Sequence, residues 1–215
     1  MGKIKKFFDR FWYLLWKDNS IKGWILSIVV IFVVIKFAFF PLLNLITGTP
    51  LPIAIVESCS MYHQGDIFSN FNSWWQRHDA KYSSIGISEQ NFIHFSFSNG
   101  FSKGDVIFIV GADPNKLKIG DVIVFSSGTE NTPVIHRVIN ITEVNGTRVF
   151  TTMGDNNNAI LMPNNNQGQV DERAIYPNQI VGKAVFRIAP YIGWIKLVFF
   201  DSRLPSYERG FCSES

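Results

Sequence analysis

Cysteine is scarce in this chain, and the two that it has, Cys59 and Cys212, stand far apart in the sequence. Neither belongs to a C-x-x-C pair or to a cluster of cysteine and histidine, the spacings that bind structural zinc. Charged residues make up only 17% of the chain, and no concentrated basic stripe of the kind that binds nucleic acid follows residue 46. The sequence therefore predicts no metal, no cofactor and no nucleic-acid partner, and it leaves a disulfide open.

Hydrophobic residues are abundant instead, at 47% of the chain, and much of this excess lies in residues 24–46. This run has Lys36 as its one charged residue and is long enough to cross the apolar core of a bilayer. A buried core helix is one alternative, and a signal peptide, whose apolar stretch is shorter, is another. We interpret residues 24–46 as a transmembrane helix, in which Lys36 either extends to the interface or contacts a partner subunit.

Residues 1–23 form a basic flank ahead of this helix. Its positive residues outnumber its two acidic ones, Asp9 and Asp18, and are Lys3, Lys5, Lys6, Arg10, Lys17 and Lys22. By the positive-inside rule we expect a single-pass protein of the cell membrane with a cytoplasmic N-terminus and an extracytoplasmic domain at 47–215. The mixture of aromatic and charged residues at 7–16 predicts a segment lying flat in the headgroup region.

Short β-branched runs bounded by turn residues follow the anchor. They predict strands at residues 105–110, 121–125, 134–141, 148–153 and 180–187. This spacing is typical of an antiparallel barrel or sandwich, so we predict a mainly β domain. Residues 69–91 and 156–169 break the spacing and are interpreted as insertions into loops. The first insertion is either a partly ordered surface loop or an aromatic lid.

Ser60 and His136 are the candidate nucleophile and base. Ser60 lies in IVESCSMYHQGD at residues 55–66, and a serine in such a turn usually makes only local hydrogen bonds unless a base is near. His136, in a predicted strand, shares a face with aliphatic residues, where histidine is commonly structural. A neutral imidazole is nevertheless the usual base for a serine hydroxyl, and it needs an acid to orient it. Asp155 and Asp171 are the downstream candidates, although each alone also fits a turn or cap.

These blocks together resemble the signal peptidase I family, in its archaeal and endoplasmic-reticulum branch. The resemblance covers most of residues 24–195 apart from the two insertions. In chain order it comprises the anchor, S-C-S-M at 58–61, G-D-V-I-F at 104–108, G-D-V-I-V-F at 120–125, V-I-H-R-V at 134–138, G-D-N-N at 154–157, I-V-G-K at 180–183 and P-Y-I-G at 190–193. The ordered series is more specific than any single block.

The resemblance implies a signal-peptidase-type β-barrel and a serine endopeptidase that removes signal peptides from exported preproteins after small residues. Ser60 matches the nucleophile, and His136 stands where bacterial members carry a lysine base. Ser58, with the backbone N–H groups around Ser60, matches the side that stabilises the oxyanion. Counting back from I-V-G-K gives Asp171 as the triad acid, which we expect to accept a hydrogen bond from His136. Asp155 then supports it in the same polar cluster.

The sequence also departs from the family, and it leaves alternatives. Tyr62-His63 follow the methionine where the family usually has a proline, and Cys59 replaces the common glycine, which raises the alternative of a thiol nucleophile. A catalytically idle membrane-anchored scaffold or binding subunit of a processing complex would lose Ser60 or His136. A soluble self-cleaving repressor with a Ser-Lys dyad would lack the anchor. The implied partners are signal peptides, the lipid bilayer and membrane partner subunits.

Overall fold

The structure, a computed structural model, describes residues 2–65, 71–126, 133–163, 171–201 and 209–214. The chain divides into two compact units, Met1–Ile46 and Thr47–Ser215. The division falls between the predicted anchor and the predicted β-domain.

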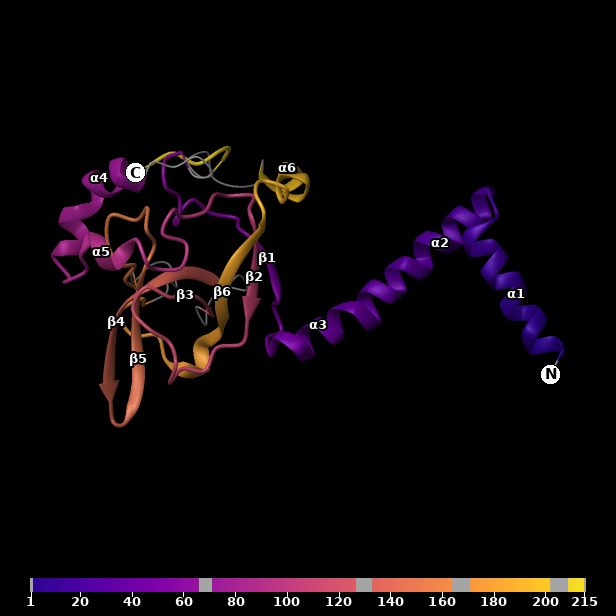
Figure 1. The fold of residues 1–215 in the computed structure, drawn as a ribbon, viewed down its shortest axis with the longest axis horizontal. Coiled ribbons are helices and arrows are strands. Elements are labelled where there is room, and N and C mark those ends of the chain that lie inside the picture. The colour runs from indigo at the N-terminus through magenta and orange to yellow at the C-terminus, as the bar shows by residue number, and fades with distance from the viewer. Residues whose placement is uncertain (1, 66–70, 127–132, 164–170, 202–208, 215) are drawn as a thin grey trace. The chain divides into compact units, whose positions relative to one another are not determined.

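The first unit is helical (Figure 1). Its elements are α1 (Gly2–Trp16), α2 (Ile21–Val34), the π-helical turn η1 (Ile35–Phe39) and α3 (Phe40–Thr47), which also takes in the first residue of the second unit. Ser20 caps α2 by accepting a hydrogen bond from the backbone N–H of Gly23. The wider π-helical turn ends two residues before Pro41, which has no backbone N–H to continue an α-helical ladder. Together the elements from Ile21 to Thr47 form a 27-residue apolar helix that is long enough to cross a bilayer.

Six strands of the second unit form one antiparallel sheet in the order β1-β2-β6-β3-β4-β5. The strands are β1 (Ile53–Ile55), β2 (Val106–Val110), β3 (Val122–Phe125), β4 (Val134–Val144), β5 (Thr147–Met153) and β6 (Ile180–Ala189). The predicted antiparallel β-domain is confirmed. Strand β1 was not predicted, because three residues are too few to show an alternating pattern. Asn145 and Gly146 connect β4 to β5, both with positive φ, as a tight two-residue hairpin turn requires.

Strand β3 is buried on both of its faces. Val122 and Val124 pack in one hydrophobic cluster, with Met61 and Ile107, whereas Ile123 and Phe125 pack in another, with Val138 and Phe150. Strand β4 pairs with β3 so that Ile123 lies opposite His136 and Val122 lies opposite Arg137. Because side chains alternate along a strand, the side chains of His136 and Arg137 leave β4 in opposite directions.

From residue 71 on, the first insertion is not the partly ordered surface loop that was one of our two alternatives. It contains the helices α4 (Phe71–Ser83) and α5 (Glu89–Phe92). The aromatic residues of these helices form a third buried cluster with side chains of β4 and β5; its aromatic members are Trp74, Trp75, Tyr82 and Phe92. The spacing of Phe71, Trp74, Trp75 and Tyr82 is that of one helix face, a signal that the many polar neighbours obscured.

Parts of both predicted insertions, residues 66–70 and 164–170, lie outside the described residues. Residues 156–163 form neither helix nor strand. The helix that ends the domain is α6 (Trp194–Asp201), and the short helix η3 (Pro177–Gln179) leads into β6. The last described segment, 209–214, lies beside α4 at the end marked C in Figure 1.

Candidate active site

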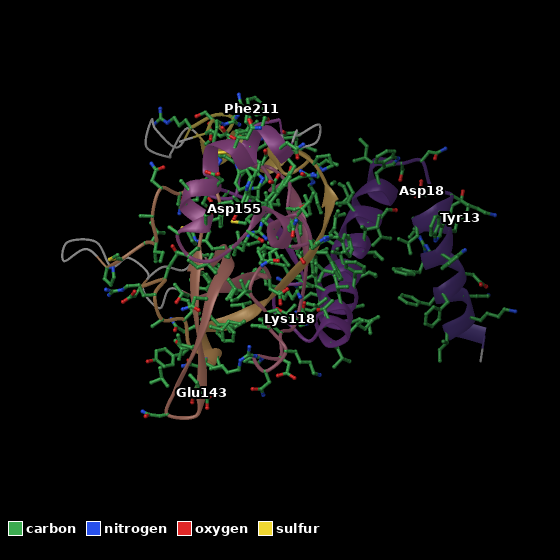
Figure 2. The ribbon with its side chains drawn as sticks, turned by 60° about the vertical axis from the view of Figure 1, so that its left-hand side comes forward. Tyr13, Asp18, Lys118, Glu143, Asp155 and Phe211 are labelled. Atoms are coloured by element: carbon green, nitrogen blue, oxygen red, sulfur yellow. A yellow bond between two sulfur atoms is a disulfide. The ribbon has the colours of Figure 1, made fainter. Side chains whose placement is uncertain are left out.

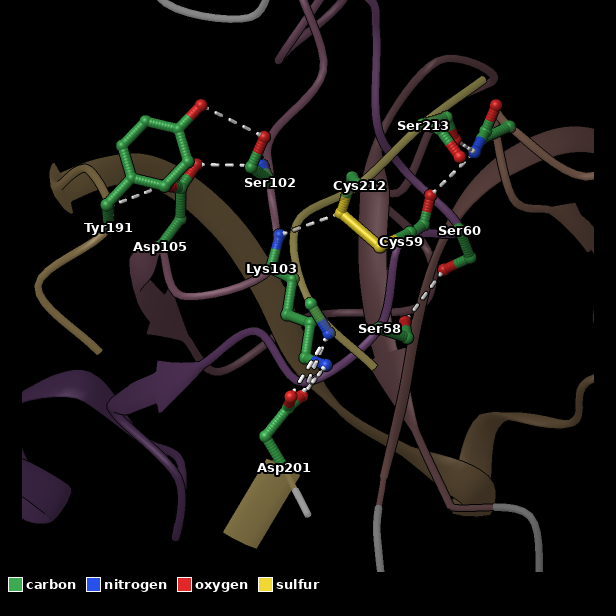
Figure 3. The surroundings of a disulfide bond; sticks show 12 residues. Ser58, Cys59, Ser60, Ser102, Lys103, Asp105, Tyr191, Asp201, Cys212 and Ser213 are labelled. Carbon is green, nitrogen blue, oxygen red and sulfur yellow. Dashed lines mark hydrogen bonds and ion pairs between the residues drawn. A yellow bond between two sulfur atoms is a disulfide. The ribbon is translucent and has the colours of Figure 1, made fainter. Parts of the chain in front are cut away.

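Ser60 lies in the turn that follows β1. Its neighbour Met61 is 1% exposed and packs in the cluster with Val122 and Val124, which ties this turn to the core. The hydroxyl oxygen of Ser60 lies 3.2 Å from that of Ser58 (Figure 3). Ser58 is exposed and Ser60 is half-buried, so both hydroxyls are within reach of a bound peptide.

His136 is buried in β4 with a carboxylate at one ring nitrogen. Its Nδ1 hydrogen-bonds Oε1 of Glu172, which is fully buried. The hydroxyl of Thr152 donates to the same oxygen at 2.9 Å, and the N–H of Leu161 donates to Oε2 at 2.9 Å. A carboxylate at Nδ1 favours the tautomer that carries its proton there, which leaves a lone pair on Nε2. Within the described part of the chain, Nε2 of His136 makes no hydrogen bond.

Asp171 does not make the hydrogen bond that we predicted. Its carboxylate pairs with Arg173 at the surface, at 2.6 and 2.7 Å, and this hydrogen bonding lowers the pKa of Asp171. The backbone gives the reason: the N–H of Thr152 donates to the carbonyl of Glu172, whose own N–H donates to Leu161. These bonds hold residue 172 against β5 with its side chain inward. The acid that contacts His136 is therefore one residue further along the chain than predicted.

Asp155 lies in a separate buried cluster (Figure 2). Its carboxylate accepts hydrogen bonds from Nε and Nη2 of Arg137 at 2.9 and 2.6 Å, from Nε2 of His63 at 2.9 Å and from the hydroxyl of Tyr82 at 2.8 Å. Burial alone would raise the pKa of Asp155, but attraction to Arg137 and these hydrogen bonds hold it well below its usual range. The expected shared cluster with His136 is not seen, because Arg137 and His136 leave β4 in opposite directions.

The surroundings of His63 favour its neutral form. Its ring stacks on Trp74 with centroids 3.6 Å apart, and its Nδ1 is buried without a hydrogen-bond partner. Burial lowers the pKa of His63, and the hydrogen bond to Asp155 offsets only part of this effect. The Nε2 atom therefore carries the proton and donates it to Asp155.

The G-D-N-N turn connects these groups to the candidate nucleophile. The N–H of Asn156 donates to the carbonyl of Ser60 at 2.7 Å, and its side-chain amide donates to the carbonyl of Cys59 at 3.1 Å. The ammonium of Lys81, on α4, donates to the carbonyls of Asp155 at 2.6 Å and Asn157 at 3.1 Å. Helix α4 of the first insertion thus holds the turn, and the turn holds the backbone of Ser60.

The structure connects Ser60 and His136 indirectly, through β5 and the G-D-N-N turn, and the described residues show no direct hydrogen bond between them. Thr152, near the end of β5, contacts the carboxylate that binds His136, and Asn156, four residues on, contacts Ser60. Sequence reasoning had missed five side chains of this arrangement, namely His63, Lys81, Tyr82, Arg137 and Glu172. The signals were modest: Arg137 stands in the H-R-V block, and Glu172 adjoins a chosen acid.

Cys59 and Cys212 form a disulfide with their Cα atoms 5.4 Å apart (Figure 3). A sulfur in a disulfide is no nucleophilic thiolate, so this bond excludes the thiol alternative in the oxidised protein. In the described segments, no group of three or more histidine, cysteine, aspartate or glutamate side chains is arranged to hold a metal ion.

Comparison with known proteins finds relatives of one kind. The chain is 29% identical over 115 residues to the signal peptidase complex catalytic subunit SEC11C of Homo sapiens, which is 49% of this chain and 54% of the relative. The corresponding subunit of Canis lupus familiaris gives the same values. The resemblance to the signal peptidase I family is confirmed. SEC11 of Candida tropicalis is 26% identical over 116 residues, which is 50% of this chain and 62% of that protein.

No protein-family model matches the chain. The chain spans about half the length of the curated relatives it matches. All of these relatives are named as catalytic subunits of a peptidase complex, the eukaryotic type that the histidine at position 136 had indicated.

Proposed function

We propose that this protein is a membrane-anchored serine endopeptidase that cleaves signal peptides from exported preproteins after small residues. The observation that carries the proposal is the buried His136–Glu172 pair, which leaves Nε2 of the imidazole available as a base. The similarity to signal peptidase catalytic subunits supports it independently. Glu172 takes the role that the sequence had given to Asp171.

In the proposed reaction, the Ser60 hydroxyl attacks the carbonyl carbon of the last signal-peptide residue while Nε2 of His136 takes its proton. The tetrahedral intermediate then loses the C–N bond, and the imidazolium gives the proton to the leaving amine. Water repeats the sequence on the acyl-enzyme and frees the signal peptide. Ser58, whose hydroxyl is 3.2 Å from that of Ser60, stabilises the oxyanion together with backbone N–H groups.

Substrate binding must also turn the Ser60 hydroxyl from Ser58 toward His136. Catalytic hydrogen bonds are often long or absent in free enzymes and tighten when substrate binds, so the missing Ser60–His136 bond is compatible with this role. Asp155 supports the site indirectly in this proposal, because its ion pair with Arg137 holds the turn that contacts Ser60.

Strand β1 provides a place for the substrate. It lies at one edge of the sheet and leads directly into the Ser60 turn. An extended peptide that adds to such an edge is held by backbone hydrogen bonds, and alternate side chains select its sequence. We propose that the residues before the cleaved bond bind in this way.

The proposed location is the cell membrane, with residues 1–23 cytoplasmic and the β-domain outside. The basic flank supports this orientation, and so does the disulfide, since such bonds persist in oxidising compartments. The relatives are subunits of a complex, so we also propose membrane partner subunits, with Lys36 as a candidate contact. A protease added outside intact cells should digest residues beyond 46 but spare the flank.

The decisive assay uses the full chain in liposomes with a preprotein whose cleavage is followed by gel and mass spectrometry. Wild-type protein should cut at one site, and Ser60→Ala should not cut, while Ser84→Ala, which changes an exposed hydroxyl at the end of α4, should cut normally. Binding of the preprotein without cleavage by the wild type would favour an idle binding subunit.

A further inference from the structure

The last described residues of the chain lie against the candidate nucleophile. Cys212 is bonded to Cys59, the residue before Ser60, across a sequence separation of 153 (Figure 3). We call residues 209–214 the tail segment. Its position is not explained by the proposed triad, and the domain core does not contain it.

Further contacts join the tail segment to both sides of Ser60. The side-chain amide of Asn156 donates to the carbonyl of Cys59 at 3.1 Å and to that of Ser213 at 3.0 Å. The carboxylate of Glu214 accepts a hydrogen bond from the backbone N–H of Gln64 at 2.9 Å. The tail segment is therefore attached one residue before Ser60 and four residues after it.

The tail segment is itself fixed to the domain. Arg77 of α4 donates to both oxygens of Glu214, at 2.9 and 3.0 Å. The N–H of Gly210 donates to the carboxylate of Asp201, at 3.1 and 3.3 Å, and the ring of Phe211 packs on Trp194 with centroids 4.8 Å apart. These contacts fix the tail segment to two helices, α4 and α6. The disulfide therefore connects Cys59 to a segment that is itself held in place.

We propose that the Cys59–Cys212 disulfide and Glu214 position the Ser60 nucleophile. This inference rests on the proposed function of Ser60. The buried Met61 anchors the Ser60 turn just after the nucleophile, and the N–H of Asn156 holds the carbonyl of Ser60 itself. The residue before Ser60 is held by the disulfide and by the side chain of Asn156. Displacing a reacting group by about 1 Å can reduce the rate by about 10²-fold. Cutting the disulfide removes the covalent restraint on this side of the turn and leaves the hydrogen bond from Asn156, so the rate of the chemical step falls.

Reduction cuts the bond without changing the sequence. A dithiol reductant delivers two electrons and two protons to the two sulfurs, leaves Cys59 and Cys212 as thiols, and is itself oxidised to a cyclic disulfide. Removal of the reductant and mild oxidation reverse the change. Each protein sample thus serves as its own control.

The test measures kcat and KM for preprotein cleavage by the full chain in detergent, oxidised and reduced. On reduction we expect kcat to fall about 10-fold with KM nearly unchanged, and to recover on reoxidation. The double variant Cys59→Ala, Cys212→Ala should have the kcat of the reduced wild type, and the reductant should not change it. Glu214→Gln should lower kcat by a smaller factor, whereas Glu143→Gln, at the exposed hairpin end, should not.

Amide hydrogen exchange on the same samples supplies a measurement that does not need activity. Reduction should speed exchange in residues 56–63, where the N–H of Tyr62 donates to Cys59, and leave β4 and β5 unchanged. Unchanged exchange in 56–63, or an equal rise in the strands, overturns the positioning role.

The two proposals can fail separately. If the oxidised wild type cuts and Ser60→Ala does not, the proposed function stands. If kcat is then the same before and after reduction, only the positioning role is overturned. If the wild type does not cut at all, the proposed function fails, and hydrogen exchange alone decides whether the tail segment holds the turn.

Discussion

Two buried carboxylates, one beside each face of β4, differ in what neutralises them. Asp155 pairs with Arg137, a permanent cation, and with two further donors, His63 and Tyr82. Glu172 pairs with an imidazole, whose charge depends on a proton, and with the neutral donors at Thr152 and Leu161. A permanent ion pair fixes a shape, whereas an imidazole that is oriented by a carboxylate can exchange a proton with a substrate.

In our proposal, the Asp155 region stabilises the fold and the Glu172 region takes part in the chemistry. Arg137 also donates to the carbonyls of Ser96, Phe97 and Gly120, so it joins three chain segments at the Asp155 turn. The Glu172 region contains no such cation within the described residues. Nδ1 of His136 is bonded to Glu172, and in our proposal Nε2 acts as the base.

The largest expected effect comes from Glu172→Gln. The amide cannot stabilise the imidazolium that forms during the reaction, and losses on the order of 10⁴ in kcat follow when such an acid is replaced in serine proteases. Asp171→Asn is the matched control, since among the described residues that carboxylate pairs with Arg173, two residues away, at the surface. Preprotein kinetics on both variants check this prediction. An equal loss in Asp171→Asn would restore the acid inferred from the sequence.

Arg137→Met should produce the next largest effect, on folding. The change leaves the carboxylate of Asp155 buried without its cation, and breaking a buried pair in this way costs about 3–5 kcal/mol. Denaturant unfolding of the full chain in detergent, followed by tryptophan fluorescence, measures it. Arg173→Met removes the partner of an exposed pair and should not move the midpoint. A midpoint for Arg137→Met equal to wild type would remove the architectural role.

Acidification should weaken the Asp155 region first at His63. Burial lowers the pKa of His63 in the folded protein, so the unfolded chain binds the proton first as the pH falls. Neutral His63 therefore contributes stability at pH values above the ordinary pKa of histidine. This stability is lost as the pH falls from the ordinary pKa toward the lowered one. Because the pKa of Asp155 is also lowered, the stability contributed by its carboxylate is lost only in far more acidic solution. Unfolding midpoints at about pH 7.5 and about pH 5.5, one on each side of the ordinary histidine pKa of about 6.5, should differ less in His63→Gln than in wild type.

A second histidine provides the control for that measurement. Burial also lowers the pKa of His78, but this residue lies nearer the surface and pairs with the carbonyl of Trp74. His78→Gln should keep most of the wild-type difference between the two pH values. If instead it removes the difference, the acid sensitivity belongs to α4 and not to the Asp155 cluster.

Tyr82→Phe should have the smallest effect. It removes one of four hydrogen bonds to the Asp155 carboxylate and leaves Arg137 in place, so we expect a loss of about 1 kcal/mol in unfolding free energy. Preprotein cleavage at saturating substrate should change little. A large fall in kcat with unchanged stability would mean that Asp155 takes part in the chemistry after all.

The sequence was most informative where the signal is local. Five strands, the apolar helix and the pair Ser60 and His136 stand in short motifs or periodic runs, and a single residue's neighbours are enough to show them. The insertion at 71–92 was harder, because α4 has a polar average composition and its buried face depends on side chains of β4 and β5 that lie far along the chain.

The sequence by itself determined that the chain has one long apolar span and a mainly β domain, and it predicted Ser60 and His136 as candidate site residues, because these follow from hydropathy, strand period and motif order. Only the tertiary structure decided that Glu172 and not Asp171 contacts His136. The two acids are adjacent, and which one points inward depends on backbone hydrogen bonds from residue 172 to Thr152 and Leu161. The same holds for the disulfide, since a pairing across a separation of 153 residues exists only once the fold brings both ends together.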